Sequence, residues 1–184
     1  MSLILTLDSA GTPIRWSTWE DAVTAHCKGL IAWSLGDETT YYGGKSRLSG
    51  DVSTVSVPSI IALKGNAKIK RIVPALTNKA LFGRDLNLCG YCGNEFHPIK
   101  LTRDHILATS RGGKNAWGNV VTACKKCNNH KDDKTLEEAG MSLLYVPYVP
   151  CRNEALILKN RSVLADQMDY LRAHLPKHSR LLNG

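Results

Sequence analysis

The sequence predicts an α+β protein with a metal-stabilised module in its middle. Three observations predict this class: alternating apolar runs and turn residues near the N-terminus, two Cys-x-x-Cys pairs in the middle, and a helical apolar stripe near the C-terminus. The 184 residues are 43% hydrophobic and 22% charged, which is typical of a folded protein and excludes a disordered one. No apolar run approaches the roughly 20 residues that a membrane-spanning helix needs.

We expect residues 1–63 to form a small mixed α+β subdomain. Strand signals occur at three places, residues 3–7, 30–35 and 51–57, with a turn over 8–13, a loop or hairpin tip at 41–44 and a further apolar run over 59–63. Nothing in this region resembles a catalytic cluster. Its first residues also lack the basic segment and long apolar stretch of a secretory signal, so we expect a cytoplasmic protein.

Capping patterns predict where helices begin. Ser17 and Glu20 have capping-box spacing, which predicts a helix to about Lys28 with Gly29 as its stop. A second box at residues 135–138 predicts a short helix that ends at Gly140. Leu164, Met168, Leu171 and Leu175 are spaced by four, three and four residues, which predicts a core-facing helix over about 161–174 within a C-terminal extension at residues 142–184.

Positive charge is concentrated in the middle of the chain. The net charge is +8, and residues 64–135 carry 14 basic against 5 acidic side chains. Within this block, residues 64–84 form a basic connecting segment whose secondary structure the sequence leaves open. A basic block inside a folded chain indicates a polyanionic partner, most often nucleic acid, although a solvated lysine-rich surface has the same composition.

Four of the six cysteines form two pairs with the spacing of a metal site. The pairs are Cys89 with Cys92, and Cys124 with Cys127. Two such turns place four thiolates around one ion, so the spacing predicts a structural, coordinatively closed Zn²⁺ site. Two redox dithiols are the alternative, but neither pair lies in a thioredoxin-like βαβ context.

The residues between and beside these pairs resemble the zinc-knuckle branch of the HNH endonuclease family, of bacterial and phage type. The matching positions are Leu101-Thr102-Arg103-Asp104-His105, Arg111-Gly112-Gly113, Trp117-x-Asn119 and Cys127-Asn128-x-x-Lys131. The resemblance implies a treble-clef-like ββα-metal nuclease core over residues 85–141. It also implies a second, catalytic ion, Mg²⁺ or Mn²⁺, because carboxylate and amide oxygens are hard ligands.

The resemblance assigns a role to each of four site residues. Asp104 and Asn128 would hold the catalytic ion, His105 would be the general base, and Asn119 would position the loop around that histidine. His130 also lies near the position of the second ligand, but Asn128 directly follows the cysteine and lies three residues before Lys131, so we take Asn128 as the ligand. Phosphate contacts are expected from six basic residues: Arg84, Arg111, Lys114, Lys125, Lys126 and Lys131.

The implied activity is metal-dependent endonuclease cleavage of double-stranded DNA, by nicking or by double-strand cutting. In the family's one-metal mechanism, a histidine takes a proton from water, the hydroxide attacks the phosphorus, and the products carry 5′-phosphate and 3′-hydroxyl ends. A non-catalytic zinc-stabilised nucleic-acid-binding module and an RNA-directed nuclease are the alternatives. Target sequence and oligomeric state, monomer or homodimer, are not encoded in these motifs.

Overall fold

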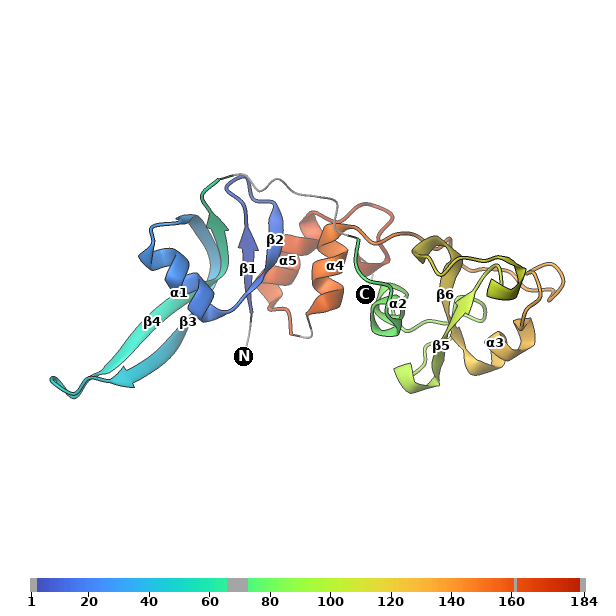
Figure 1. The fold of residues 1–184 in the computed structure, drawn as a ribbon, viewed down its shortest axis with the longest axis horizontal. Helices are drawn as coiled ribbons and strands as arrows, with labels where there is room; N and C mark the ends of the chain where they lie inside the picture. The colour runs from blue at the N-terminus through green and yellow to red at the C-terminus, as the bar shows by residue number, and fades with distance from the viewer. Residues whose placement is uncertain (1–2, 66–72, 161, 183–184) are drawn as a thin grey trace. The chain divides into compact units, whose positions relative to one another are not determined.

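The computed structural model describes residues 3–65, 73–160 and 162–182. The chain forms two compact units, each with its own core: residues 1–71 with 160–174, and residues 72–159 with 175–184 (Figure 1). The predicted α+β class is confirmed. The predicted C-terminal extension is divided between the two units, since residues 160–174 join the first one. Within the described ranges, no helix is long and apolar enough to cross a membrane.

The first unit is built on a four-stranded sheet of order β2-β1-β4-β3. Its strands are β1 (Ile4–Leu7), β2 (Pro13–Ser17), β3 (Ile31–Lys45) and β4 (Val52–Leu63). β1 pairs parallel with β4, whereas the β1–β2 and β3–β4 pairs are antiparallel. Ile4, Val57 and Ile61 lie in the buried core of this sheet, against which α1 packs.

Helix α1 (Trp19–Cys27) begins one residue later than the sequence pattern predicts. Thr18 is the N-cap and forms the capping box with Asp21, because the hydroxyl of Ser17 is used elsewhere: it accepts a hydrogen bond of 2.7 Å from Thr6. The predicted end is confirmed, since Gly29 adopts a φ of +64° directly after the helix.

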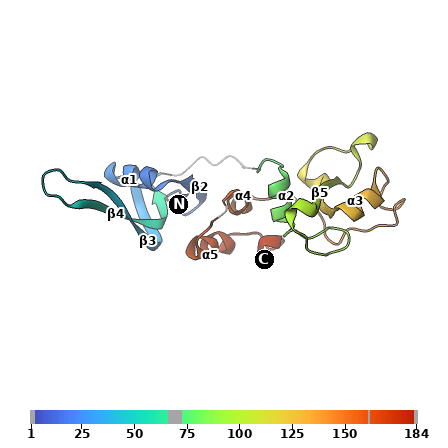
Figure 2. The same ribbon diagram turned by 90° about the horizontal axis from the view of Figure 1, so that it is seen from below.

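The β3–β4 hairpin is longer than predicted. Strand β3 continues through residues 41–44, which were expected to form the tip, and the turn lies between Lys45 and Val52. Tyr41 explains part of this extension, because its ring stacks on Trp19 of α1 with centroids 4.9 Å apart. Beyond this contact the hairpin continues as an exposed two-stranded ribbon (Figure 2).

Helix α5 (Ala165–Ala173) completes the first unit. The predicted helix is confirmed in position, with Leu171 of its apolar stripe fully buried; residue 161 lies outside the described residues. The buried side chain of Gln167 donates hydrogen bonds of 2.8 Å to the carbonyls of Leu3 and Ser59. These bonds connect the helix to the sheet, so a segment distant in sequence becomes part of the N-terminal fold.

The second unit contains an antiparallel β5–β6 hairpin followed directly by a helix (Figure 1). Its helices and strands are α2 (Asn78–Arg84), β5 (Leu101–His105), β6 (Val120–Cys124), α3 (Lys125–Lys131) and α4 (Arg152–Lys159), with short 3₁₀ helices at Pro98–Lys100, Thr109–Arg111, Trp117–Asn119 and Arg180–Leu182. Leu101 pairs with Cys124, and His105 with Val120. The α4 helix has no counterpart in the sequence prediction.

The capping box predicted at residues 135–138 forms, but no helix follows it. Thr135 and Glu138 exchange the two box hydrogen bonds, at 2.9 and 3.2 Å. Gly140 adopts a φ of +61° two residues later, and the segment is a hydrogen-bonded turn. The reciprocal side-chain bonds therefore stabilise a single turn here.

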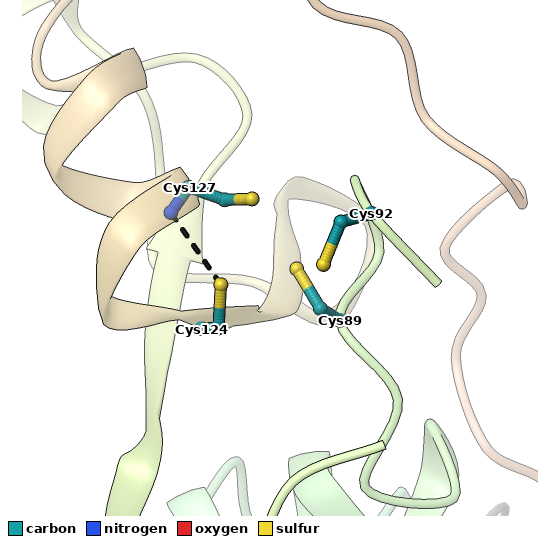
Figure 3. Close-up of side chains that lie close together, drawn as sticks. All are labelled: Cys89, Cys92, Cys124 and Cys127. Carbon is teal, nitrogen blue, oxygen red and sulfur yellow. Dashed lines mark hydrogen bonds between the residues drawn. The ribbon is translucent and has the colours of Figure 1, made fainter. Parts of the chain in front are cut away.

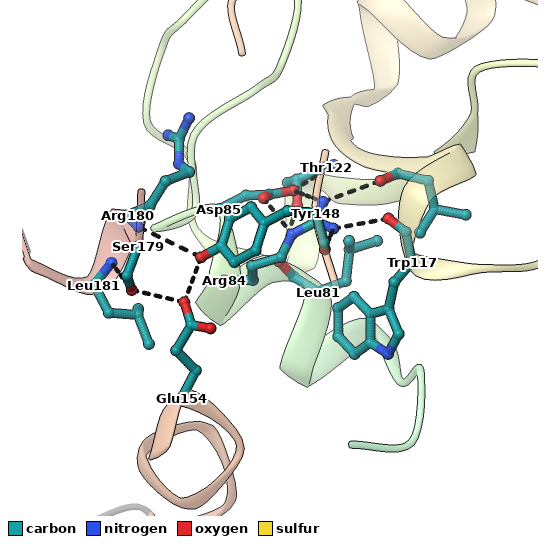
Figure 4. A network of polar contacts seen from close by, with 11 residues as sticks. Leu81, Arg84, Asp85, Trp117, Thr122, Tyr148, Glu154, Ser179, Arg180 and Leu181 are labelled. Atoms are coloured by element: carbon teal, nitrogen blue, oxygen red, sulfur yellow. Dashed lines mark hydrogen bonds and ion pairs between the residues drawn. The ribbon is translucent and has the colours of Figure 1, made fainter. Parts of the chain in front are cut away.

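Arg84 is a structural residue of the second unit. The prediction that it contacts phosphate is wrong, because the structure buries its side chain completely. Its guanidinium makes a bidentate pair with Asp85 at 2.8 and 3.0 Å and donates to the carbonyls of Trp117, Val120 and Tyr148 (Figure 4). These contacts connect α2 to β6 and to the segment that leads into α4.

A second buried polar cluster supports the end of this unit. Glu154 of α4 is fully buried and accepts hydrogen bonds from Tyr148 (2.7 Å) and Ser179 (2.6 Å) (Figure 4). It also accepts one of 2.7 Å from the backbone of Cys151. Burial, together with the bond to Glu154, raises the pKa of Tyr148 to about 12. The phenol is therefore a hydrogen-bond donor at neutral pH, as this buried carboxylate requires.

Candidate functional site

The four paired cysteines converge on one point. Their sulfur atoms all lie within 4.8 Å of one another and point toward a common centre (Figure 3). Cys89 and Cys92 come from the loop that precedes β5, whereas Cys124 ends β6 and Cys127 lies in α3. Within the described ranges, this is the only group of three or more histidine, cysteine or acidic side chains placed to share an ion.

The environment of these thiols fits a thiophilic divalent ion. Burial raises the pKa of Cys92 and Cys127, and the sulfur of Cys89 adds to the rise for both. For Cys89, burial acts in the same direction, but hydrogen bonds from the backbone of Cys92, Cys124 and Tyr91 outweigh it and lower the pKa. Four sulfurs this close repel one another as thiolates, and a bound cation removes that penalty. The donor set suits Zn²⁺.

Asp104 lies on the side of β5 that faces α3. It is 5% exposed, and its Oδ2 atom accepts a hydrogen bond from the phenol of Tyr91. Its Oδ1 atom lies 3.5 Å from Nζ of Lys131. Burial raises the pKa of Asp104, while the Tyr91 hydrogen bond and the charge of Lys131 act against the rise. Two side chains, one at each carboxylate oxygen, therefore restrain its orientation.

His105, the next residue, projects from the other face of β5 because side chains alternate along a strand. Its imidazole is half-buried, and Nε2 lies 3.3 Å from Oδ1 of Asn115. The same Asn115 oxygen accepts a bond of 2.9 Å from the guanidinium of Arg103. Arginine only donates, so this bond identifies the Asn115 atom as the oxygen. Nε2 of His105 must then donate, which leaves Nδ1 as the basic nitrogen of the neutral ring.

Asn119 closes the loop between the two strands. Its amide oxygen accepts a bond of 3.0 Å from the backbone of Leu107, and its amide nitrogen donates to the carbonyls of Leu107 and Lys114 at 3.1 and 2.9 Å. Its own carbonyl accepts a bond from the backbone of Ile106. All three side-chain bonds are made within the segment that directly follows His105.

Asn128 lies on α3 and contacts the same face of β5 as Asp104. Its amide nitrogen donates a hydrogen bond of 2.9 Å to the hydroxyl of Thr102, two residues before Asp104. This bond uses the amide nitrogen, so the amide oxygen of Asn128 is directed away from Thr102. His130 is exposed, and its Nε2 lies 3.3 Å from the carbonyl of Ala139, so its contact is with backbone.

Lys131 does not contact solvent. The expectation that it binds phosphate is wrong, because its side chain is fully buried. Its ammonium donates a bond of 2.8 Å to the carbonyl of His105 and lies 3.5 Å from both the carbonyl of Asp132 and Asp104. It faces the β-hairpin because α3 packs directly on β5 and β6.

The other predicted phosphate-binding residues of the domain are exposed. Lys114, Lys125 and Lys126 are all at the surface, and the last two line a hollow of about 400 Å³ beside the cysteine cluster together with Lys100. Arg111 is also exposed, but its guanidinium pairs with Glu138 at 2.9 Å. The surface beside the cysteine cluster, which we call the knuckle (Cys89, Cys92, Cys124 and Cys127), is thus basic.

Two contacts of the site were not anticipated from the sequence. Tyr91 lies inside the first Cys-x-x-Cys pair and reaches Asp104, and Asn115 lies in the strand-connecting loop and reaches His105. An aromatic side chain enclosed between two metal ligands is the only sequence signal that would have singled out Tyr91. For Asn115 the sequence offers no comparable signal.

An antiparallel hairpin followed by a helix and braced by a four-cysteine cluster defines a ββα-metal domain. Residues 89–144 match the family model described as HNH endonuclease, the family that the sequence resembles. A match to this family suggests a nuclease and therefore a nucleic-acid substrate. A search of curated proteins finds no match to the chain.

Proposed function

We propose that the protein is a metal-dependent DNA endonuclease with His105 as its general base and a structural Zn²⁺ ion at the four cysteines. The placement of His105 is the observation that carries the proposal. Its half-buried imidazole stands at the end of β5, one residue after the fixed carboxylate of Asp104, in the segment that matches the HNH family. A residue that served only packing would not need this combination.

Asn115 and Arg103 support the role of the imidazole. Because Nε2 donates to Asn115, Nδ1 holds the lone pair that can take a proton from water. A positioned imidazole with a free lone pair is the usual general base for such a transfer. Asn119 fixes the backbone of the loop after the histidine, and Lys131 fixes the carbonyl of His105 itself. Asn119 and Lys131 therefore hold the backbone at and after His105, and Asn115 orients the ring.

Asp104 and Asn128 are the proposed holders of the catalytic Mg²⁺ or Mn²⁺ ion. Their donors, a carboxylate and an amide oxygen, are hard ligands, and both side chains lie between β5 and α3. Two protein ligands leave the remaining positions to phosphate and water. When bound, such an ion would neutralise charge on the phosphate and on the departing 3′-oxygen.

The basic surface gives DNA a place to bind. Leu101 and His105 are separated by four residues of extended strand, about 14 Å, so the lysine-lined hollow at the cysteine end and the imidazole at the other end are within a few nucleotides of each other. We propose that Lys114, Lys125 and Lys126 contact phosphates on either side of the scissile bond. Arg111 would add to this surface if DNA displaced Glu138 from it.

The proposal is tested by incubating supercoiled plasmid with the zinc-loaded chain and Mg²⁺ or Mn²⁺, with EDTA as the metal-free control. Wild type should convert the plasmid to nicked or linear forms, and His105→Ala should lower the rate at least a hundredfold while keeping its zinc. His97→Ala is the matched control, because His97 is exposed and only caps a short 3₁₀ helix. Cleavage by His105→Ala at the wild-type rate would disprove the base assignment.

A non-catalytic binding module is the second candidate function. The basic surface favours it equally, but a binding module has no use for an imidazole whose orientation is fixed by Asn115. Binding of plasmid without any metal-dependent conversion would support it. A parallel incubation with single- and double-stranded RNA tests whether the substrate is RNA.

A further inference from the structure

We infer that Tyr91 is a positioning residue that fixes the Asp104 carboxylate to the four-cysteine knuckle, so that the structural metal and the catalytic ion are coupled through one side chain. This inference rests on the proposed function, since it concerns the carboxylate that would hold the catalytic ion. The argument begins with the backbone that carries Tyr91.

The position of Tyr91 is set by the knuckle. Cys89 and Cys92 lie on either side of it in sequence, and the amide of Gly93 donates a bond of 2.9 Å to the carbonyl of Cys89. The amide of Gly90 donates a bond of 2.7 Å to the carbonyl of Thr122 on β6. The loop that carries Tyr91 is thus closed on itself and hydrogen-bonded to the hairpin, and a metal bound by the cysteines would hold it further.

The ring of Tyr91 connects this loop to the catalytic strand. It is 9% exposed and belongs to the buried cluster that includes Val121 and Ala123 of β6. From there its hydroxyl donates to Oδ2 of Asp104. The packed ring leaves the hydroxyl little freedom to move away from the carboxylate.

The second restraint on Asp104 also originates at the knuckle. Lys131, 3.5 Å from Oδ1, lies at the end of α3, whose N-cap is Cys124. Both oxygens of the carboxylate are therefore held by elements that begin at the cysteine cluster. Groups that hydrogen-bond a ligating carboxylate orient it, and their loss typically lowers metal affinity about 10- to 100-fold.

The test compares Tyr91→Phe with Tyr145→Phe in the full, zinc-loaded chain. Tyr145 is a matched control because its hydroxyl lies beside Gly90 of the same knuckle, but burial and Asp85, not Asp104, are what raise its pKa. Zinc content is measured by metal analysis, and Mn²⁺ binding by electron paramagnetic resonance without DNA. We expect Tyr91→Phe to keep its zinc and to bind Mn²⁺ about tenfold more weakly, whereas Tyr145→Phe should match wild type in both measurements.

Further results separate the two proposals. In cleavage assays, Tyr91→Phe should raise the Mn²⁺ concentration at half-maximal rate and change the rate at saturating Mn²⁺ much less, a split that a general loss of structure would not produce. Wild-type Mn²⁺ affinity in a zinc-containing Tyr91→Phe chain would overturn the role of Tyr91 alone. A wild-type chain that neither binds Mn²⁺ nor cuts DNA would overturn the proposed function.

A second measurement needs no variant at Tyr91, in case Tyr91→Phe does not fold. Cadmium replaces zinc in the wild-type chain, and the cadmium NMR signal is followed while Mg²⁺ is added. We expect the signal to shift, because an ion at Asp104 acts on the knuckle through Tyr91, and we expect no shift in Asp104→Asn. An unchanged cadmium signal in a wild-type chain that binds Mg²⁺ would overturn the inference.

Discussion

Oδ1 of Asn115 lies 3.3 Å from Nε2 of His105, and it receives a shorter bond from Arg103. Asn115→Ala removes this acceptor, so the imidazole loses the partner that selects its tautomer and orientation. We expect the turnover number for plasmid cleavage to fall about tenfold, as is typical when a catalytic group is misplaced, while KM for DNA is unchanged. Steady-state kinetics on a defined oligonucleotide measure both constants.

Two further variants make this first test specific. Asn115→Asp keeps an acceptor oxygen facing Arg103 and His105 and should retain most of the wild-type rate. Asn129→Ala is the matched control, because Asn129 is exposed on α3. If Asn115→Ala and Asn129→Ala cleave equally well, Asn115 has no part in orienting the base.

Cys124→Ser should remove the metal from the knuckle. Cys124 is buried, ends β6 and caps α3, so the loss of its sulfur disturbs the hairpin and the helix together. Metal analysis should find about one zinc per chain in wild type and His105→Ala, and close to none in Cys124→Ser. Cys151→Ser, which lies outside the cluster, should keep its zinc. Full zinc content in Cys124→Ser would show that the cluster does not bind zinc as a four-cysteine site.

Lys131→Met tests the revised role of the buried lysine. The change leaves Asp104 buried without its cationic partner and removes the donor to the carbonyl of His105. We expect the free energy of unfolding to fall by about 3–5 kcal/mol, the usual cost of breaking a buried pair. Denaturant titration of the zinc-loaded chain measures this value, with exposed Lys134→Met as the control, which should stay within about 0.5 kcal/mol of wild type.

Lys125→Ala should weaken DNA binding without changing stability, unlike Lys131→Met. Lys125 is exposed beside the knuckle, so its loss should leave stability unchanged and weaken DNA binding uniformly across sequences. The logarithm of the binding constant, plotted against the logarithm of salt concentration, should lose about one unit of slope per phosphate contact removed. An unchanged slope would remove Lys125 from the DNA surface.

The sequence predicts the cysteine cluster and the hairpin–helix core because the information for both is local. Cys-x-x-Cys spacing imposes its own turn, and the order of strand, loop, strand and helix follows the chain. Capping boxes are local as well, but neighbouring candidates compete. Ser17 and Thr18 both have suitable side chains, and only the bond between Ser17 and Thr6 of another strand decides between them.

Burial of charged residues depends on partners that the sequence does not place. Arg84 and Lys131 have the composition of a DNA surface, and only the fold shows that Asp85 and Asp104 neutralise them in the interior. The α4 helix escaped prediction for a related reason. Glu154 is one of its buried residues. Ser179, which donates a hydrogen bond to its carboxylate, is 25 residues away in sequence.

Asp166 should make the stability of the first unit depend on acidic pH. Burial would raise its pKa, but hydrogen bonds from the hydroxyl of Ser59 and the backbone amides of Asp37 and Gln167 outweigh burial and lower it. A carboxylate whose pKa is lower in the folded state stabilises that state above its unfolded pKa of about 3.9. This stabilisation is lost as the pH falls through the folded value.

Asp166→Asn should therefore unfold more easily than wild type at pH 7, by about 1 kcal/mol for a lost charge-assisted bond, and the difference should shrink steadily below about pH 4. Thermal unfolding followed by circular dichroism from pH 7 to pH 3 measures the difference. Asp169→Asn, exposed on the same helix, is the control and should follow the wild-type curve at every pH. If Asp166→Asn remains less stable than wild type by a constant amount at every pH, Asp166 contributes through packing and not through its charge.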